Sequence, residues 1–525
     1  MADAPQVSLT VEGRRISVPA GTSILEAAKS AGVLIPHYCY HPSLPVAGVC
    51  RMCLVEVEKA AKLAPACATS VAEGQVVHVH TPKALEARRG VLEFLLINHP
   101  LDCPICDQAG ECELQDYTFR EGRAEGRLLE PKRFNPVEDF GGDVLYVTNR
   151  CILCTRCVRF MDDIVKQPVL NVSERGDRAV IGKFEGEDLT HAWAGNVIEL
   201  CPVGALLSKD FLNKARAWEL DRTPSVCPNC TQGCNAILET RDNVLVRMRP
   251  RANEDVNKHF LCEYGRLNYR WMNEGRRVEA PLVRQADRLA AVDWDQAIPA
   301  AAAILRGKHA LVLASPMLSN ESLFMLSRLV ERVGGRGVFQ VERGPEAPLE
   351  GVPDLALRAE RAANVRGAEL AGFVESATPL AELTDGDVLI IVDVGGVQPA
   401  LDASALARAA AVIVLGTTLP DVARIATAVL PITNPAEEEG TFTNLRGRVQ
   451  RYMQAKAAPA MARPAWWVLS DLVGALGGGS SYFLASDVFA ALATSRPEFA
   501  GLSYDSLGLK GALLAGAAEP AEVAR

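Results

Sequence analysis

Three cysteines and one histidine fall within the stretch HPLDCPICDQAGEC at positions 99–112. Two residues separate Cys103 from Cys106, and a loop of that length brings two sulfurs round one metal or cluster. A lone histidine at a helix end is usually structural, but His99 precedes a cysteine triad that lacks a fourth member. The segment therefore predicts a four-ligand metal centre formed by His99, Cys103, Cys106 and Cys112.

Three further sets of four cysteines surround this segment in the chain. The first has a close pair and one distant member, as in plant-type [2Fe-2S] proteins, although its first gap is ten residues and not four. The second is a CxxCxxC triad with a distant Cys-Pro, the bacterial ferredoxin arrangement for one [4Fe-4S] cluster. The third, CxxC then CxxxC and a distant cysteine, suits zinc as readily as a cluster. The sets are Cys39, Cys50, Cys53 and Cys67; Cys151, Cys154, Cys157 and Cys201; and Cys227, Cys230, Cys234 and Cys262.

The 15 cysteines all lie between Cys39 and Cys262. Together with His99 they supply four ligands for each of four centres, and no thiol remains for a nucleophile, a disulfide or a fifth centre. His37 and His41 flank Cys39, and because four cysteines are present we expect both to be neighbours of the centre or surface residues. We expect no catalytic acid, base or nucleophile in the chain.

The composition excludes several other classes of protein. The chain has 525 residues, of which 49% are hydrophobic, and a formal net charge of -9, so we expect several packed domains and no nucleic-acid partner. The first residues show no basic segment followed by an apolar one, and no apolar run approaches the roughly 18 residues of a membrane helix. We therefore expect no signal peptide, thiols that stay reduced, and membrane contact only through partner subunits.

The elements that position the ligands begin with a small β-rich region. VSLTV and RISV flank the turn pair Glu12–Gly13, which predicts a hairpin. GTSILEAAKSAG predicts a short helix capped by Thr22 or Ser23 and ended by Gly32. CLVEVE and VVHVH add strands in a β-grasp-like order, and Gly48 would let the backbone of the cysteine loop approach sulfur closely.

Helical and then α/β patterns follow. TPKALEARRGVLEFLLINH predicts a helix with His99 at its end, and CELQDYTFREGR predicts a second helix after Cys112. Beyond residue 277, ALVLAS and SNESLFMLSRLVERVGG predict a strand and a capped helix that ends at Gly334–Gly335. DVLIIVDV and AVIVLG are apolar runs typical of parallel strands covered on both faces. This half predicts a Rossmann-like layer without a GxGxxG signature after a strand.

Four segments together resemble one protein family. They are CYHPSLPVAGVCRMCLVEV, HPLDCPICDQAGECELQD, RCILCTRCVRF with ELCPVGAL, and CPNCTQGC with LCEYGR. They are similar to the G subunit, the 75 kDa-type iron-sulfur subunit, of bacterial NADH:quinone oxidoreductase (respiratory complex I). The resemblance is dense over residues 6–275. Beyond it, EEEGTFTNLRGRVQ and ARPAWWVLSDLVGALG resemble the degenerate molybdopterin-oxidoreductase-like region of the family, and the chain is short for that family.

The resemblance implies one [2Fe-2S] cluster, three [4Fe-4S] clusters and no molybdenum cofactor. The implied ligands are Cys39, Cys50, Cys53 and Cys67 for [2Fe-2S], and, for the three [4Fe-4S] clusters, His99, Cys103, Cys106 and Cys112; Cys151, Cys154, Cys157 and Cys201; and Cys227, Cys230, Cys234 and Cys262. The last cluster is favoured over zinc by its likeness to the domain that opens molybdopterin oxidoreductases.

The implied fold is an α+β multidomain chain. Its expected domains are a β-grasp [2Fe-2S] ferredoxin-type domain (1–82), a helical [4Fe-4S] domain with one histidine ligand (83–122), a ferredoxin-like [4Fe-4S] domain (140–220), a [4Fe-4S] domain of molybdopterin-oxidoreductase type (221–276) and a truncated, degenerate α/β domain (277–525).

By the same resemblance, the chain is an electron relay in the peripheral arm of proton-translocating NADH:quinone oxidoreductase. It carries electrons from the flavin subunit toward quinone and contains neither the NADH site nor the quinone site. The implied partners are the flavin/NADH-binding subunit and other iron-sulfur subunits of that arm. The implied location is peripheral, on the cytoplasmic side of the inner (plasma) membrane.

Three alternatives remain open. A molybdenum-dependent, formate dehydrogenase-like catalytic subunit has similar N-terminal clusters, but here the ferredoxin-like part has a single CxxCxxC and no cysteine remains for molybdenum. An iron-sulfur diaphorase subunit of a bidirectional hydrogenase usually stops before the fourth set and the α/β region. The non-enzymatic alternative is a scaffold with zinc in the set that begins at Cys227.

Overall fold

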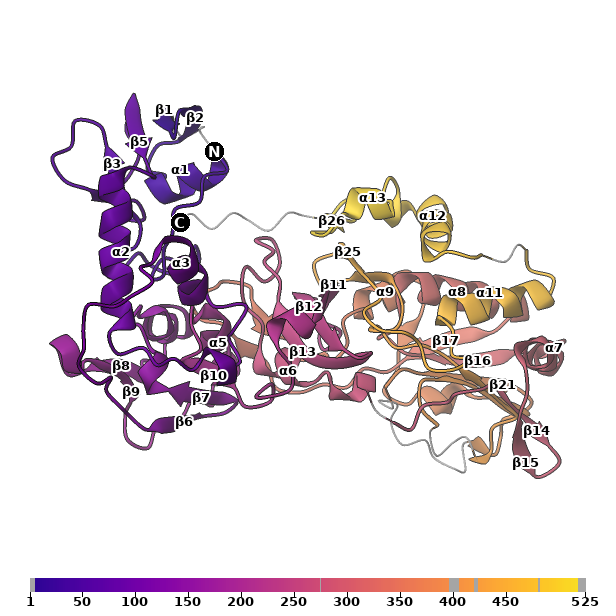
Figure 1. Ribbon diagram of the computed structural model, residues 1–525. Helices are drawn as coiled ribbons and strands as arrows, with labels where there is room; N and C mark the ends of the chain where they lie inside the picture. Colours follow the sequence, from indigo (N-terminus) through magenta and orange to yellow (C-terminus); the bar gives the residue numbers. More distant parts are fainter. Residues whose placement is uncertain (1–4, 274, 396–405, 420–423, 480–481, 518–525) are drawn as a thin grey trace. The chain divides into compact units, whose positions relative to one another are not determined.

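The computed structural model describes residues 5–273, 275–395, 406–419, 424–479 and 482–517 (Figure 1). The chain forms two compact units, Met1–Leu220 with Leu349–Pro353 and Asp221–Pro348 with Asp354–Arg525. The first unit contains the ligand sets that begin at Cys39, His99 and Cys151, and the second contains the set that begins at Cys227. Within the described ranges, no helix has both the length and the apolar character needed to cross a bilayer.

The N-terminal strands form the predicted hairpin. Strand β1 (Gln6–Val11) pairs antiparallel with β2 (Arg14–Pro19). The connecting residues Glu12 and Gly13 have φ angles of 46° and 76°, the left-handed pair that a type I′ turn requires. The turn chemistry read from the sequence is therefore confirmed.

A helix and a mixed sheet complete this β-grasp region. Helix α1 (Ile24–Ser30) starts after Ser23, whose hydroxyl accepts a hydrogen bond from the Glu26 N–H at 3.2 Å, so Ser23 and not Thr22 is the cap. Gly32, with φ of 71°, follows the helix as predicted. The sheet order is β2-β1-β5-β3-β4, with β1 and β5 parallel. The added strands are β3 (Leu54–Val57), β4 (Ala64–Pro65) and β5 (Gln75–His78).

Two helices flank the His99 segment, as predicted. Helix α2 (Pro82–Leu96) precedes it, and α3 (Glu113–Glu121) begins directly after Cys112. The predicted helix had His99 at its end, but α2 ends at Leu96, three residues earlier. Pro100 accounts for the earlier end, since the residue before a proline is disfavoured in helical conformation.

A second sheet, in the order β10-β7-β6, supports the Cys151 set. Strand β7 leads into the CxxCxxC loop and β10 follows Cys201, so the antiparallel pairing of Leu206 with Tyr146 returns the distant cysteine to the triad. The elements of this region are β6 (Val137–Gly141), β7 (Val144–Val147), β8 (Leu170–Ser173), β9 (Val180–Lys183), β10 (Leu206–Ser208), α4 (Arg156–Arg159), the π-helical turn η3 (Phe160–Val165) and α5 (Asn196–Leu200).

The second unit opens with a three-stranded antiparallel sheet. Its first two strands pair as far as Val226 and Asn235, so Cys227 and Cys234 leave the sheet side by side. The N–H of Cys227 donates to the Cys234 carbonyl at 2.8 Å. The elements are β11 (Asp221–Val226), β12 (Asn235–Arg241), β13 (Val244–Pro250) and α6 (Glu263–Leu267).

In the part of the chain that the structure describes, the α/β region is built on an eight-stranded sheet with an antiparallel hairpin at one edge. Taken in chain order, its parallel strands lie across the sheet as 3-2-1-4-5-6, the doubly wound Rossmann order. The parallel strands are β16 (Ala310–Ala314), β17 (Arg336–Phe339), β20 (Val374–Glu375), β21 (Val388–Asp393), β22 (Ala411–Gly416) and β23 (Ala428–Pro431), and the hairpin is β14 (Leu282–Gln285) with β15 (Arg288–Ala291).

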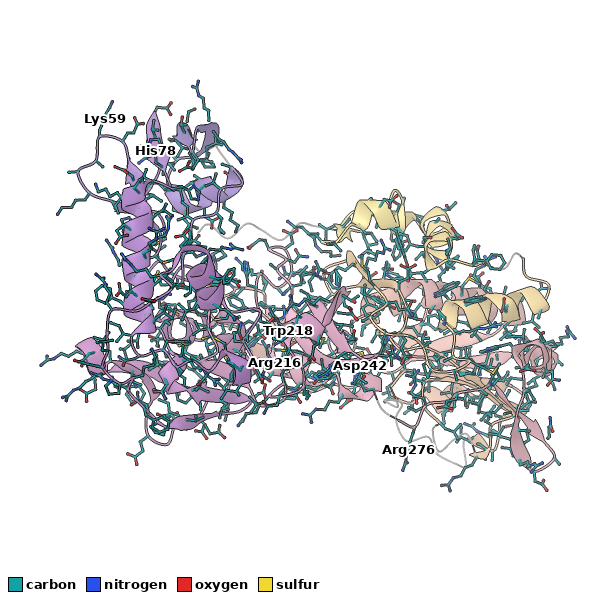
Figure 2. All side chains as sticks on the ribbon, in the orientation of Figure 1. Lys59, His78, Arg216, Trp218, Asp242 and Arg276 are labelled. Carbon is teal, nitrogen blue, oxygen red and sulfur yellow. The ribbon has the colours of Figure 1, made fainter. Side chains whose placement is uncertain are left out.

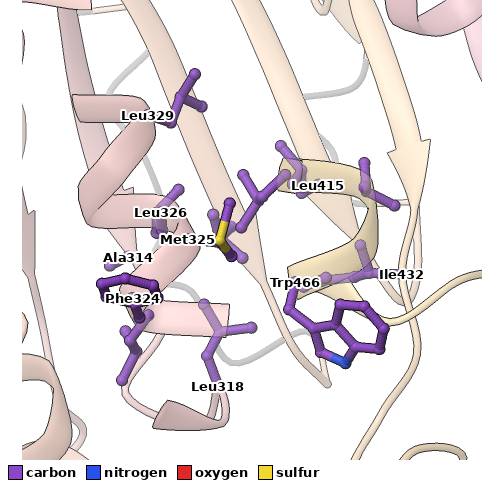
Figure 3. Close-up of a cluster of buried hydrophobic side chains, with 14 of the residues drawn as sticks. Ala314, Leu318, Phe324, Met325, Leu326, Leu329, Leu415, Ile432 and Trp466 are labelled. Carbon is purple, nitrogen blue, oxygen red and sulfur yellow. The ribbon is translucent and has the colours of Figure 1, made fainter. Parts of the chain in front are cut away.

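Apolar side chains cover both faces of this sheet. Leu311 of β16 belongs to the core cluster on one face, and its neighbour Val312 belongs to the cluster on the other face. Figure 3 shows part of the larger cluster, in which Met325, Leu415 and Trp466 come together from a strand and two helices. The predicted doubly covered, Rossmann-like layer is confirmed.

The predicted capped helix is α8. The Ser319 hydroxyl accepts from the Ser322 N–H at 3.1 Å, and Gly334 ends the helix with φ of 60°. The helices of this region are α7 (Trp294–Leu305), α8 (Asn320–Val333), α9 (Val365–Leu370), α11 (Ala465–Ala475), α12 (Ala485–Ser495) and α13 (Tyr504–Leu507). A small sheet contains β24 (Gly440–Thr443), β25 (Arg448–Tyr452) and β26 (Ala512–Leu513). Shorter elements are β18 (Ala347–Pro348), β19 (Ala356–Leu357), η1 (Cys103–Ile105), η2 (Thr148–Arg150), η4 (Gly176–Arg178), η5 (Ala217–Glu219), η6 (Arg270–Asn273), η7 (Pro379–Glu382) and η9 (Pro497–Phe499).

Leu389→Ala in β21 should weaken the α/β sheet strongly. Leu389 is fully buried, and a cavity of this kind costs about 2–5 kcal/mol. Hydrogen–deuterium exchange of peptides spanning β21 and β22 should accelerate by on the order of a hundredfold, since about 1.4 kcal/mol is tenfold. The control is Val374→Ala at the exposed edge strand, which should change exchange little. Equal protection in the two variants would contradict the assigned core.

Candidate metal centres

The four cysteines of the Cys39 set converge. The Cys39 thiol lies within hydrogen-bonding reach of the Cys50 and Cys67 thiols, and Cys53 contacts Cys67 in the same way. The N–H of Cys39 also lies 3.5 Å from Cys50 Sγ. Donation from Cys50 and Cys67 lowers the pKa of the Cys39 thiol below its usual range, while the pKa of Cys67 is raised. These sulfurs are close enough to share protons, and all but Cys50 are buried.

The loop around this set contains Gly48 and two histidines. Gly48 has φ of 64°, a left-handed conformation that favours glycine, and a Cβ there would meet only Ala68 Cβ at 3.9 Å. A close approach of this backbone to the sulfides of a cluster stays a prediction. His37 Nδ1 lies 2.8 Å from a backbone carbonyl oxygen, and His41 Nδ1 accepts from the Ser43 N–H at 3.2 Å. Both histidines therefore have backbone partners outside the set.

Three members of the His99 set line a cavity beside α2 and α3. His99, Cys103 and Cys112 all contribute to its wall. His99 Nδ1 is buried and has no hydrogen-bond partner among the described residues. Burial, aided by the positive charges of Arg150 and Lys132, lowers the pKa of His99 to about 4, so the imidazole is neutral at pH 7. A neutral imidazole is the form that ligates metals, and a buried nitrogen without a partner is costly, so a metal ligand role fits this side chain.

Long-range contacts fix the fourth donor of this set, Cys106. Arg216, labelled in Figure 2, donates from Nη1 to the Cys106 carbonyl at 2.7 Å. Arg150 donates from Nε and Nη2 to Asp102 Oδ2 at 3.1 and 3.0 Å. A Cβ on Gly204 would lie 2.2 Å from Cys106 Sγ, so only glycine leaves room for this sulfur. The sequence patterns assigned no role to these residues; the only local signal was the Val-Gly pair after Cys-Pro.

The four thiols of the Cys151 set line one small cavity whose remaining walls are mainly apolar. Leu153 and Thr155 have left-handed φ angles of 53° and 62°, and the Leu153 N–H donates to Cys151 Sγ at 3.4 Å. Burial raises the pKa of Cys151 to about 11 and that of Cys154 to about 12. Thiolates in this cavity require a compensating positive charge, which a metal centre supplies.

The Cys227 set gathers around the start of α6. The Gly265 N–H donates to Cys262 Sγ at 3.2 Å, and a Cβ on Gly265 would lie 3.2 Å from Cys227 Sγ. Cys234 is close enough to the other three thiols for their charges to raise its pKa further, after burial as the main cause. All four thiols are buried, and this chemistry suits zinc as well as iron.

The cysteines are all free thiols. Across the described ranges, no three His, Cys, Asp or Glu side chains stand close enough to hold a single metal ion. In [2Fe-2S] and [4Fe-4S] clusters, four ligands are distributed over a core of several irons and sulfides.

Family models match the chain in the order of the ligand sets. The matches are a 2Fe-2S iron-sulfur cluster binding domain (4–82), the NADH-ubiquinone oxidoreductase-G iron-sulfur binding region (88–127), the ferredoxin-like domain of NADH-quinone oxidoreductase subunit 3 (141–207), the molybdopterin oxidoreductase Fe4S4 domain (220–274) and molybdopterin oxidoreductase (277–418 and 384–475).

Curated relatives agree with these matches. The G subunit of NADH-quinone oxidoreductase from Rickettsia bellii is 40% identical over 331 residues, which cover 62% of this chain and 48% of the relative. The mitochondrial 78 kDa subunit of NADH-ubiquinone oxidoreductase from Candida albicans is 41% identical over 340 residues, which cover 63% of this chain and 46% of the relative. Over the matched residues, the chain is similar to the G subunit of NADH-quinone oxidoreductase.

These matches confirm the resemblance, the α+β multidomain fold class and the presence of 2Fe-2S-binding and 4Fe-4S-binding domains. The chain spans about half the length of the curated relatives it matches. A chain of an NAD+-reducing [NiFe]-hydrogenase in the H2-reduced state is 29% identical and matches 40% of this chain and 90% of that chain, with a TM-score of 0.37. A score at this level does not establish a shared arrangement of domains.

Gly204→Ala should disrupt the His99 set of this G-subunit homologue. The added Cβ collides with Cys106 Sγ, so iron content should fall by about four per chain, the content of one [4Fe-4S] cluster. The matched control is Gly90→Ala in α2, where a Cβ meets nothing within 4 Å and alanine should stabilise the helix by about 0.5–1 kcal/mol. Full iron content in Gly204→Ala would show that Cys106 is not held as described.

Proposed function

We propose that the chain is an electron-transfer iron-sulfur subunit of proton-translocating NADH:quinone oxidoreductase, carrying electrons from the flavin subunit toward quinone. One observation supports the proposal: the cysteines of this G-subunit homologue lie in four sets, and beside the set with three cysteines is His99, whose buried Nδ1 has no hydrogen-bond partner among the described residues. In this role the chain is a relay and contains neither the NADH site nor the quinone site.

Within this proposal, the Cys39 set holds one [2Fe-2S] cluster and each of the other three sets holds one [4Fe-4S] cluster. The proposed ligands are Cys39, Cys50, Cys53 and Cys67; His99, Cys103, Cys106 and Cys112; Cys151, Cys154, Cys157 and Cys201; and Cys227, Cys230, Cys234 and Cys262. The proposed domains are 1–82, 83–122, 140–220, 221–276 and 277–525, in the order given by the sequence.

An iron-sulfur cluster supplies one-electron chemistry, and the chain supplies its environment. The cavity of the Cys151 set is walled mainly by apolar side chains, which exclude water. The N–H groups of Leu153 and Gly265 donate to cysteine sulfurs. Such hydrogen bonds offset negative charge on sulfur and so favour the reduced state. No side chain has to accept or release a proton in this role.

The proposed partners are the flavin/NADH-binding subunit and other iron-sulfur subunits of the peripheral arm. The proposed location is the cytoplasmic side of the inner (plasma) membrane, with membrane contact through partner subunits only. The names of the relatives, which are subunits of NADH-quinone and NADH-ubiquinone oxidoreductases, support both proposals.

A buried carboxylate argues against the molybdenum-enzyme alternative. In doubly wound sheets, phosphate binds at the N-terminus of the helix after the first strand, which here is α8. Glu321 is fully buried in the first turn of α8 and accepts from the Thr441 N–H at 3.0 Å, the Thr441 hydroxyl at 2.9 Å and the Tyr504 hydroxyl at 2.9 Å. A side chain of the protein, whose pKa is raised to about 7 by burial, is thus packed into the first turn of this helix, which supports the expectation that no phosphate-bearing pterin binds there.

Metal analysis of the purified chain should find about fourteen irons, the sum for one [2Fe-2S] and three [4Fe-4S] clusters. Cys230→Ser should remove about four of them, because a centre with three buried thiolates and an open position is unstable. Thr231→Ser, next to Cys230, is the matched control and should retain the full content. One zinc with about ten irons would establish zinc in the Cys227 set, and stoichiometric molybdenum or tungsten would contradict the proposed function.

His99→Cys should change the low-temperature EPR spectrum of one reduced [4Fe-4S] centre and leave the others unchanged. The substitution replaces a neutral imidazole with a thiolate and so adds one negative charge beside that centre. His78→Cys is the control, because His78 pairs with Glu58 at the surface, 3.0 Å away. Identical spectra for wild type and His99→Cys would remove His99 from the ligand assignment.

A further inference from the structure

Two arginines of α4 lie between three ligand sets of the first unit. Arg156 and Arg159 flank Cys157 in the segment RCVRF. The sequence patterns assigned neither of them a role, because arginines next to a cysteine triad have no characteristic spacing of their own. Their side chains leave the Cys151 set and reach the backbone beside other sets.

The guanidinium of Arg159 joins two sets directly. Its Nη2 donates to the carbonyl of Cys39 at 2.5 Å and to the carbonyl of Cys154 at 3.3 Å. Its Nη1 donates to the carbonyl of Pro45, and its Nε donates to Thr155 Oγ1 at 3.3 Å. A single planar cation therefore bridges a ligand of the Cys39 set and a ligand of the Cys151 set.

Arg156 is buried and makes contacts similar to those of Arg159. Its Nη2 donates to the Tyr40 carbonyl at 2.8 Å, and its Nη1 donates to the Leu200 carbonyl at 3.2 Å. The same Nη1 lies 3.5 Å from Glu113 Oε1. Each of these three partners adjoins a ligand of a different set. Arg156 Nε is buried and has no hydrogen-bond partner among the described residues, which leaves one N–H for a further acceptor in this position.

Two carboxylates face this pair of arginines. They are Glu113, whose pKa is raised by burial, and Asp163 beside Arg159. Arg156 and Arg159 also repel each other, which means that a nearby gain of negative charge stabilises both. Reduction of a centre adds one negative charge, and between poorly solvated groups this attraction is weakly screened.

We propose that Arg156 and Arg159 are positioning residues that hold the Cys39 and Cys151 sets against each other, and that their charge raises the reduction potentials of the centres in both sets. The inference rests on the proposed function, because it requires an iron-sulfur centre in each set. On this proposal, the charges of two side chains of α4 act on the centres of the Cys39 set and the Cys151 set together.

The test is an EPR-monitored redox titration of the full chain with its iron, comparing wild type with Arg159→Met, Arg159→Lys and Arg178→Met. A unit charge about 10 Å from a centre, at an effective dielectric constant of about 20, changes an equilibrium by about tenfold. For a one-electron couple that is about 59 mV. Both midpoint potentials should fall by this order in Arg159→Met. Arg159→Lys should restore them, since it keeps the charge.

Arg178→Met is the matched control, because it removes the same charge from an exposed residue of the same unit. If Arg159→Met retains its iron and both potentials equal those of Arg178→Met, the proposal is overturned. If Arg159→Met loses iron, Arg159→Lys decides: retained iron with wild-type potentials supports the role of charge, and loss of iron there too overturns it. Absence of cluster signals from the wild-type chain would instead overturn the proposed function, so the two failures are distinguishable.

Discussion

The gathering of buried thiols is the constraint on which the rest of the structure depends. Burial raises the pKa of Cys151 to about 11 and that of Cys201 to about 11, so thiolates in that set need a positive centre among them. Strand pairing brings cysteines that are distant in the sequence together. Pairing of β7 with β10 returns Cys201 to its triad, and pairing of β11 with β12 places Cys227 beside Cys234. Metal binding and folding of these loops are therefore linked.

Residue types and spacing predicted the first hairpin and the doubly covered strands, which the structure contains, and the four ligand sets, which stay a prediction; each of these signals is local. The CxxCxxC motif and the Glu12–Gly13 turn are each contained in one short stretch of the sequence. The contacts of Gly204 with Cys106 and of Arg216 with the Cys106 carbonyl join loops about a hundred residues apart. No short sequence pattern can predict contacts over that separation. The same holds for Arg159 and Cys39, which meet only after the β-grasp region and α4 have packed.

The α/β region has the strand order of nucleotide-binding proteins, but this order does not by itself give it their function. The apolar runs predicted its strands, but their order across the sheet depends on which crossovers pack, and sequence alone does not give it. The order found is the one in which nucleotide sites form where the strand order reverses. Here Glu321 is buried in the first turn of α8 and accepts from Thr441, and Ser315 and Asp393 line a small cavity at the point of reversal. A Rossmann sheet is thus retained with a buried side chain of the protein at the start of its first crossover helix.

The proposed relay role would favour arginine, and not a titrating side chain, between the sets. A group that tunes potentials for electrons alone must not change its own charge over the working pH range, since titration would couple electron transfer to protons. The guanidinium remains protonated in proteins and offers five donors in a fixed plane, so Arg159 can bind the Cys39 and Cys154 carbonyls while keeping its charge. His99, with a pKa lowered to about 4, is neutral over the same range. Both side chains therefore present constant charge to the centres they adjoin.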